Sequence, residues 1–255
     1  MLEGKKGVIL GVANAHSLAW HIAKSVHRDG GQMRLGVANE RFRSKAHRLA
    51  ERLHAGEPVV CDVTSDESIQ TAFERFAEDL GELDFVVHAV AFARKEDLEG
   101  RFMDTTRSGY HLAQDISAYS LAAVCKAAEP YLKEGSSILT LSYIGSVRAM
   151  PSYNVMGVAK AALESSVRYL AVDLGAKGIR VNALSAGPIK TLSSSAIKGL
   201  KEKLDLQEKA TPLKRRLTGE EVGNAAAFLL SDLASAVTGE VLYVDNGYHI
   251  IGSLG

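Results

Sequence analysis

Short apolar runs alternate with longer amphipathic stretches along this chain. Seven runs are expected to form strands, at residues 7–12, 32–37, 58–63, 83–90, 136–142, 179–184 and 240–244. Their apolar character is nearly continuous, which is typical of strands that are covered on both faces, as in parallel sheets flanked by helices.

Between these runs, apolar residues recur at spacings of three and four, which predicts helices. The helical stretches are residues 18–28, 41–53, 66–79, 117–132, 155–174 and 220–230. Asp66 is expected to cap one helix, and Thr218 with Glu221 to form a capping box at another. The alternation predicts an α/β fold: a Rossmann-type, doubly wound, seven-stranded parallel sheet flanked by helices, as a single domain spanning 1–255.

Residues 190–216 are rich in Ser, Lys and Leu and fit no strand of this sheet. They lie between the sixth strand and the next helix, where a loop could close over a ligand. We therefore expect a substrate-binding loop there.

Charge and cysteine content narrow the class of partner. Thirty Lys and Arg residues balance thirty Asp and Glu residues, so the formal net charge is zero. No overall basic field exists to attract a nucleic acid or an anionic membrane, which favours a small-molecule partner. Cys61 and Cys125 lie in apolar surroundings and are expected to be buried, reduced thiols, as in a cytoplasmic protein. No membrane span, secretion leader or metal site is expected.

The end of the first predicted strand carries features of a dinucleotide site. Gly11 closes the strand, and a helix begins after Ser17 at Leu18, where free N–H groups could meet a pyrophosphate. Only Gly11 remains of the G-x-G-x-x-G pattern, so an ordinary strand-to-helix turn is an alternative. Asp62, after the third strand, could bind the adenine amino group. Small residues around Val90, after the fourth strand, could let the backbone approach a cofactor.

Cofactor preference should be decided after the second strand, where Ala38, Asn39, Glu40 and Arg41 follow one another. An acidic or polar side chain there binds the ribose 2′-hydroxyl of NADH, whereas an Arg accommodates the 2′-phosphate of NADPH. The segment contains both kinds of side chain. The segment slightly favours NADH as the cofactor, and NADPH is the alternative.

The most informative segment follows the fifth strand. Tyr153 and Lys160 are seven residues apart at the start of a helix, so they share one face about 10 Å apart along the axis. A tyrosine hydroxyl can donate a proton to a developing oxyanion, and a nearby ammonium can favour its phenolate while holding a ribose. Alternatively, Tyr153 packs against a neighbouring surface and Lys160 is a solvent-facing helix residue.

Several motifs together resemble one family. They are Gly11 with Ser17-Leu18-Ala19, Asp62-Val63, residues 88–93, residues 115–120, Leu141-Ser142-Tyr143, residues 153–160 and residues 185–192. Over nearly its whole length the chain resembles the short-chain dehydrogenase/reductase superfamily, and within it the enoyl-(acyl-carrier-protein) reductases. Alcohol dehydrogenases of the superfamily carry Asn-Asn-Ala-Gly after the fourth strand and a catalytic Ser after the fifth. Here residues 88–91 and Tyr143 stand in those places.

The resemblance implies roles for individual residues. The active-site residues implied are Tyr143, Tyr153 and Lys160, with Lys160 on the nicotinamide ribose. The dinucleotide contacts implied are Gly11, Ser17, Leu18, Ala38, Asp62, Val63, Val90, Lys160, Ile189, Lys190, Thr191, Leu192 and Ser193. The acyl pocket implied is formed by Ala93, Met156, Ile197 and Leu200, for which core packing is the alternative.

By this resemblance the chain is expected to be a cytoplasmic homotetramer that reduces trans-2-enoyl thioesters on acyl carrier protein with NADH, during fatty-acid elongation. Tyr153 would then donate a hydrogen bond to the thioester oxygen, and Tyr143 would shape the pocket or transfer a proton. Two alternatives stay open. One is a 3-ketoacyl or other carbonyl reductase that uses Ser142, and the other is a non-catalytic dinucleotide sensor.

Overall fold

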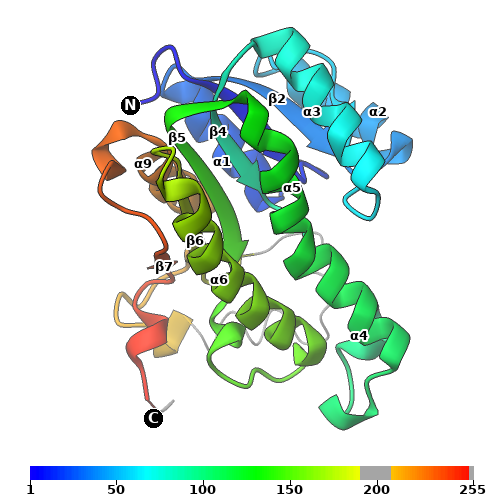
Figure 1. The fold of residues 1–255 in the computed structure, drawn as a ribbon. Helices are drawn as coiled ribbons and strands as arrows, with labels where there is room; N and C mark the ends of the chain where they lie inside the picture. Colours follow the sequence, from blue (N-terminus) through cyan, green and yellow to red (C-terminus); the bar gives the residue numbers. More distant parts are fainter. Residues whose placement is uncertain (190–207, 253–255) are drawn as a thin grey trace.

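The computed structural model of the protein describes residues 1–189 and 208–252. All seven strands are parallel and form one sheet in the order β3-β2-β1-β4-β5-β6-β7. The strands are β1 (Lys6–Leu10), β2 (Gln32–Val37), β3 (Val59–Val60), β4 (Leu83–His88), β5 (Leu132–Ser142), β6 (Arg180–Ala186) and β7 (Val241–Val244). The predicted doubly wound, seven-stranded sheet is confirmed (Figure 1).

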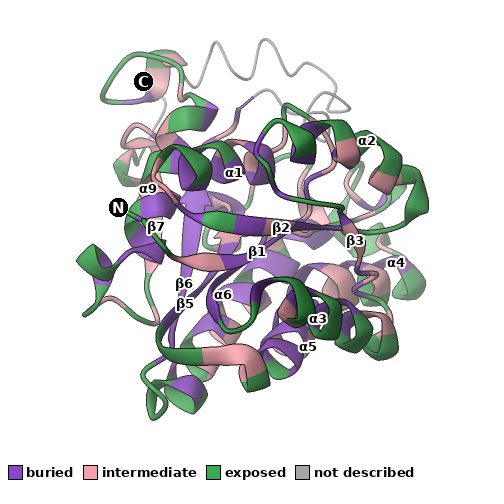
Figure 2. Ribbon diagram, turned by 90° about the horizontal axis from the view of Figure 1, so that it is seen from above, coloured by how far each residue is buried: buried purple, intermediate pink, exposed green. Residues whose placement is uncertain are grey.

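Helices cover both faces of the sheet (Figure 2). They are α1 (Leu18–Arg28), α2 (Glu40–Glu51), α3 (Asp66–Leu80), α4 (Arg107–Gln114), α5 (Ser120–Ala128), α6 (Asn154–Gly175) and α9 (Gly219–Leu230). Apolar residues of α1, α2 and α9 form one hydrophobic cluster, and those of α3, α5 and α6 form the other. The sheet therefore lies between two separate hydrophobic layers.

Alternate residues of each central strand point into opposite layers. In β1, Ile9 packs with α1 and α9, whereas Val8 and Leu10 pack with α3 and α5. In β4, Val87 belongs to the cluster with α1 and α9, and Val86 belongs to the cluster with α3 and α5. This two-residue alternation with apolar residues on both faces is why the strands appear as continuous apolar runs in the sequence.

The segment before β5 differs from the prediction of one helix over 117–132. The chain instead forms α4, a π-helical turn at Asp115–Tyr119, α5, and a 3-10 turn at Glu129–Tyr131. Pro130 explains the early end of α5, because proline lacks the N–H that an α-helix requires. The strand β5 then begins at Leu132, earlier than predicted.

Two further local predictions have different outcomes. The Thr218 and Glu221 capping box is present, since the Thr218 N–H donates to Glu221 and the Glu221 N–H donates to the Thr218 hydroxyl. The prediction that Asp66 caps α3 is wrong, because Ser65 accepts the N–H of Ser68 at 3.2 Å. Asp66 lies in the first turn instead, where its charge suits the helix dipole.

The predicted third strand is also shorter than expected. Only Val59 and Val60 pair as strand, against the predicted residues 58–63. Cys61 continues alongside β2 through one hydrogen bond to Val37, and Cys61 and Cys125 are both buried free thiols, as predicted. In the described ranges, no helix is long and apolar enough to cross a bilayer.

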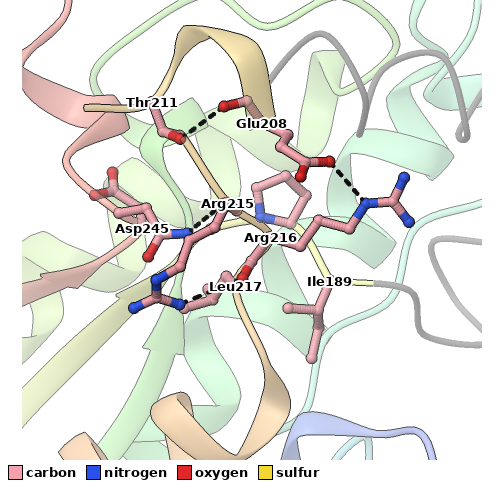
Figure 3. Close-up of a pocket in the computed structure, with 10 residues that line it drawn as sticks. Ile189, Glu208, Thr211, Arg215, Arg216, Leu217 and Asp245 are labelled. Carbon is pink, nitrogen blue, oxygen red and sulfur yellow. Dashed lines mark hydrogen bonds and ion pairs between the residues drawn. The ribbon is translucent and has the colours of Figure 1, made fainter. Parts of the chain in front are cut away.

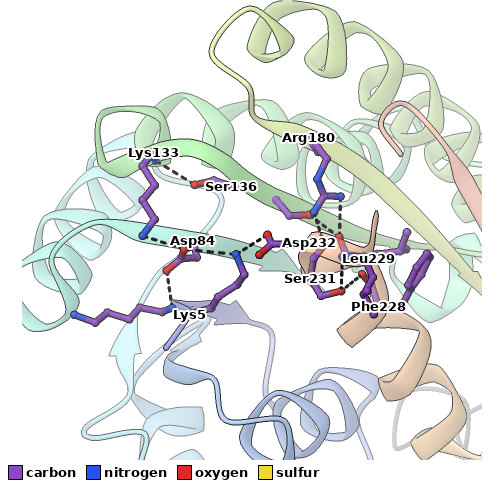
Figure 4. Close-up of polar contacts among 12 residues, drawn as sticks. Lys5, Asp84, Lys133, Ser136, Arg180, Phe228, Leu229, Ser231 and Asp232 are labelled. Carbon is purple, nitrogen blue, oxygen red and sulfur yellow. Dashed lines mark hydrogen bonds and ion pairs between the residues drawn. The ribbon is translucent and has the colours of Figure 1, made fainter. Parts of the chain in front are cut away.

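Arg180, the first residue of β6, connects the sheet to the end of α9 (Figure 4). Its guanidinium donates hydrogen bonds to the carbonyls of Leu229 at 2.9 Å, Ser231 at 3.1 Å and Val237 at 3.3 Å. Each of these carbonyls also accepts one other hydrogen bond, from the Ser137 hydroxyl, the Ala234 N–H and the Asn182 amide, so the guanidinium adds charged donors to carbonyls that the fold already binds.

We expect Arg180→Ala to lower the free energy of unfolding by about 2 kcal/mol, because three hydrogen bonds from a charged, largely buried donor to backbone carbonyls are lost together. The melting temperature should fall by about 4–8 °C in a thermal-denaturation scan. The matched control is Arg75→Ala on α3, whose pairing with Glu78 is exposed and should contribute nothing measurable. Equal melting temperatures for the two variants would contradict this role.

Candidate active site

Gly11 brings the ends of β1 and β4 into contact. Its φ is +93°, and a Cβ atom there would lie 2.2 Å from the carbonyl oxygen of Ala89. Its N–H donates to the Gly36 carbonyl on the neighbouring strand β2. Only glycine tolerates both the backbone conformation and the close approach. We call this close approach of Gly11 to Ala89 the Gly11 cradle. It lies at the carboxyl edge of the sheet, where ligands of such folds bind.

The amino end of α1 follows this cradle. Ser17 caps the helix by accepting the Trp20 N–H at 3.2 Å, and its hydroxyl donates to the Asn14 carbonyl at 2.8 Å. Leu18 is the first helical residue. Unpaired N–H groups and the positive end of the helix dipole at this position suit a phosphate group.

The other residues predicted to contact a dinucleotide surround the same edge. Ala38 is exposed directly after β2, and Asp62 accepts hydrogen bonds from the Thr64 N–H and hydroxyl. Val63 and Val90 pack into the hydrophobic layer beside α3, so their side chains have a structural role at least. Among the dinucleotide residues of the sixth-strand turn, Ile189 is buried, and residues 190–193 lie outside the described residues.

The residues expected to decide cofactor preference are engaged locally. Asn39 caps α2 by accepting the Phe42 N–H, and Glu40 pairs with Arg43 at 3.0 Å. Capping by Asn39 is a role that the sequence analysis did not anticipate.

The two predicted active-site tyrosines meet at the junction of β5 and α6. Tyr143 follows the last residue of β5, and Tyr153 precedes the first residue of α6. Their ring centroids lie 4.9 Å apart with the planes at 69°, an edge-to-face arrangement. Gly145 lies against both rings, because a Cβ atom there would be 2.5 Å from Tyr153 and 3.2 Å from Tyr143.

Lys160 lies two helical turns further along α6 and is only 5% exposed. Its Nζ donates a hydrogen bond to the Leu141 carbonyl at 2.8 Å. Burial lowers the pKa of Lys160 to about 8, and the charge of Glu164 acts in the opposite direction. The structure thus brings Tyr143, Tyr153 and Lys160 to one edge, as predicted.

Burial raises the pKa of Tyr153 well above its usual range, and the neighbouring Tyr143 and Glu164 raise it further. The expected effect of the Lys160 ammonium on the phenolate stays a prediction. Burial likewise raises the pKa of Tyr143 to about 12. Both hydroxyls therefore keep their protons at neutral pH and can act as hydrogen-bond donors.

Glu164 is a buried residue of this site that the sequence analysis missed. It accepts a hydrogen bond from the hydroxyl of Ser142, the last residue of β5. Its spacing could have identified it from the sequence, because Glu164 follows Lys160 by four residues and so lies on the same helix face. The hydroxyl of Ser142 is directed to this carboxylate.

His88 is a second buried polar residue behind the site. Its ring nitrogens contact the hydroxyls of Thr140 at 3.0 Å and Ser120 at 2.8 Å. Burial lowers its pKa to about 3, and the charge of Lys160 acts in the same direction. His88 is therefore neutral, and its hydrogen bonds connect β4 with β5 and α5.

A cavity of about 160 Å³ opens beside the end of β6 (Figure 3). It is lined by Gly187, Pro188, Ile189, Glu208, Thr211, Arg215, Arg216, Leu217, Asp245 and Asn246. Arg216 pairs with Glu208 at 3.0 Å across it. Of the predicted acyl-pocket residues, Met156 is buried on α6 and Ala93 is half-buried, whereas Ile197 and Leu200 lie outside the described residues.

We expect Gly145→Ala to reduce turnover by about 100-fold in any reaction that uses the two tyrosines, because the added methyl group displaces both rings. The assay is reduction of an enoyl thioester, as the family resemblance implies. Gly175→Ala is the matched control, since a Cβ at this α6 position meets nothing within 4 Å. Normal turnover of the Gly145 variant would show that the ring arrangement is not required.

The chain is similar to known proteins over nearly its whole length. A family model described as enoyl-(acyl carrier protein) reductase matches residues 11–249. The NADH-type enoyl-[acyl-carrier-protein] reductase of Bacillus cereus is 50% identical over 254 residues, covering 99% of each chain. The corresponding protein of Nostoc is 50% identical over 254 residues, covering 98% of each.

Solved structures agree over the whole fold. An Anaplasma phagocytophilum enoyl-(acyl-carrier-protein) reductase in complex with NAD superposes with a TM-score of 0.95 at 50% identity, covering 99% of this chain and 96% of that one. The Bacillus cereus enzyme with NADP+ and indole naphthyridinone superposes with a TM-score of 0.96 at 49% identity, covering 99% and 100%. The chain described here belongs to the enoyl-(acyl carrier protein) reductase family.

Proposed function

We propose that this protein is an enoyl-(acyl-carrier-protein) reductase that reduces the trans-2 double bond of enoyl thioesters during fatty-acid elongation. The observation that supports this most directly is the Tyr143 and Tyr153 pair beside the buried Lys160, in a chain of this family. The substrate is carried by acyl carrier protein, as the names of the relatives imply.

The carboxyl edge of the sheet fits a dinucleotide. The Gly11 cradle would be filled by any Cβ atom, and the amino end of α1 faces the same opening. The residues that would hold the dinucleotide are Gly11, Ser17, Leu18, Ala38, Asp62, Val63, Val90, Lys160 and residues 189–193. NADH is the proposed cofactor, since the relatives are named NADH enzymes, and NADPH is an alternative because the Bacillus cereus structure holds NADP+.

The side chains present suit this reaction. When bound, reduced nicotinamide would supply a hydride to the β-carbon of the enoyl thioester, which places negative charge on the thioester oxygen. Uptake of a proton at the α-carbon would then complete the reduction. The Tyr153 hydroxyl keeps its proton because burial raises its pKa, so it can donate a hydrogen bond to that oxygen. Tyr143 packs edge-on against Tyr153 and shapes the pocket around it. Lys160, whose ammonium donates to the Leu141 carbonyl, would bind the nicotinamide ribose with its remaining N–H donors.

Two alternatives have less support. A carbonyl reductase that used Ser142 would need its hydroxyl free for substrate, but that hydroxyl donates to the buried Glu164. A dinucleotide sensor has no need of the protonated Tyr153 hydroxyl at this position. The structural arrangement therefore favours enoyl reduction.

We also propose that the protein is a homotetramer located in the cytoplasm. We infer a single catalytic domain over 1–255 with a substrate-binding loop at about 190–216, of which 190–207 lie outside the described residues. A homotetramer is supported by Tyr169 and Val172, which are 74% and 78% exposed on α6 and form an apolar surface suited to a symmetry mate. The zero net charge supports a cytoplasmic protein without nucleic-acid or membrane partners.

The experiment that tests this function follows the absorbance of NADH and NADPH with crotonyl and longer enoyl thioesters. We expect oxidation of NADH with the enoyl substrates, and no comparable rate with matched 3-ketoacyl thioesters. Faster turnover of the ketoacyl series would favour the carbonyl reductase. Tight NADH binding without oxidation by either series would favour the sensor.

We expect Tyr153→Phe to lower kcat by about 100-fold or more, because the developing charge on the thioester oxygen loses its hydrogen-bond donor. Dinucleotide affinity should be unchanged, since Lys160 and the Gly11 cradle are intact. Tyr143→Phe is the matched control on the partner ring and should have the smaller effect on kcat. Wild-type turnover of the Tyr153 variant would rule out the role of its hydroxyl.

A further inference from the structure

Glu164 is a buried carboxylate without a role in the reaction proposed above. It is only 5% exposed. Counted along α6, it follows Lys160 by four residues and Tyr153 by eleven, so the three side chains form one stripe on the helix. A carboxylate in a protein interior is costly unless a nearby charge or hydrogen bond compensates for lost hydration. Its position beside the site therefore requires a physical reason.

The hydrogen bonds of Glu164 and Lys160 end on consecutive residues of β5. Lys160 donates to the Leu141 carbonyl at 2.8 Å, and Glu164 accepts from the Ser142 hydroxyl. Within 1–189 and 208–252, no ion pair of 4.0 Å or less joins Lys160 to Glu164. Because Leu141 and Ser142 are adjacent on β5, the two charged groups are held close to each other, each by a different hydrogen bond.

This arrangement leaves the ammonium available. An ammonium carries three N–H donors, and one of them is used by the Leu141 carbonyl. A direct ion pair with Glu164 would occupy another. The carboxylate is instead hydrogen-bonded to the Ser142 hydroxyl at the end of β5.

Other titratable groups around this pair do not replace the charge of Glu164. They are His88 from β4, Tyr143 and Tyr153 at the junction of β5 and α6, and Tyr243 and Asp245 at the end of β7. The histidine is neutral because burial lowers its pKa to about 3, and burial raises the pKa of each tyrosine. The Asp245 carboxylate is engaged by the side chain of His249 at 2.9 Å and by two backbone N–H groups.

We propose that Glu164 is a positioning residue for the reductase: Ser142 holds its carboxylate at the end of β5, where its negative charge compensates the buried Lys160 ammonium without an ion pair, so that the ammonium can bind the dinucleotide. This inference rests on the proposed function, because it assigns Lys160 to the cofactor. It concerns a residue that does not touch the reacting atoms.

The proposal has a definite pH dependence. In the wild-type protein, burial lowers the pKa of Lys160 to about 8, so the ammonium is charged below that pH and neutral above it. Dinucleotide affinity is therefore full below pH 8 and declines as the pH rises through it. Removing the charge of Glu164 lowers the pKa of Lys160 further, because Glu164 is the group that raises it. The decline should then begin at lower pH.

The test is the Kd of NADH, measured by its fluorescence between about pH 6 and pH 10, on the full chain. The variants are Glu164→Gln, which keeps an oxygen for Ser142 but loses the charge, and Ser142→Ala, which keeps the charge but releases the carboxylate. Asp173→Asn is the matched control, since this α6 residue is exposed and loses the same charge. Circular dichroism checks the fold of each variant.

We expect Glu164→Gln to move the midpoint of the affinity decline down by about one pH unit, with NADH binding about fivefold weaker at pH 8. Ser142→Ala should move the midpoint upward, because the freed carboxylate can pair directly with Lys160, and should weaken binding at every pH. Asp173→Asn should leave the profile unchanged. Opposite shifts in two neighbouring variants are not expected from a general loss of packing.

A wild-type midpoint in both variants would overturn the proposal. If Glu164→Gln does not fold, the upward shift of Ser142→Ala decides the question, and its absence overturns the proposal. The proposed function fails separately, if the wild-type protein binds NADH with the expected pH profile but does not reduce enoyl thioesters.

Discussion

The hydrogen bond from Lys160 to the Leu141 carbonyl connects the helix that carries the site to the strand that supports it. A buried ammonium is stable only where hydrogen bonds and nearby charge compensate for its lost hydration. The Leu141 carbonyl at the end of β5 supplies the hydrogen bond. Glu164, held by Ser142, supplies the nearby charge. The position of Tyr153 depends on the same connection, because it begins the helix that Lys160 anchors.

The tyrosines illustrate how burial sets chemistry. Tyr143 and Tyr153 pack edge-to-face over Gly145, and both residues are half-buried. Burial raises the pKa of each phenol, so both remain protonated and serve as donors. A lower pKa would make the Tyr153 phenol a stronger acid, but only the protonated phenol can donate to a developing oxyanion.

Much of the fold was predictable because both layers of the sheet are apolar. Residues 32–37 and 18–28 were predicted with the bounds that β2 and α1 have, since burial of both strand faces and of one helix face leaves a clear periodicity. The helix α4 and the π-helical turn after it were missed, because the turn is held by contacts across the fold, such as the Ser117 hydroxyl with Phe92. The short β3 was overestimated because its apolar residues continue beyond the paired region.

The sequence by itself determined the alternation of strands and helices, the glycine at Gly11, the capping box at Thr218 and the shared helix face of Tyr153 and Lys160. Each depends on residues close together in the chain, whose spacing and conformational preferences act locally. Only the tertiary structure decided that Lys160 bonds to Leu141, that Ser142 holds Glu164 and that the Tyr153 phenol stays protonated. These properties depend on burial and on groups brought together from separate elements, which local sequence does not specify.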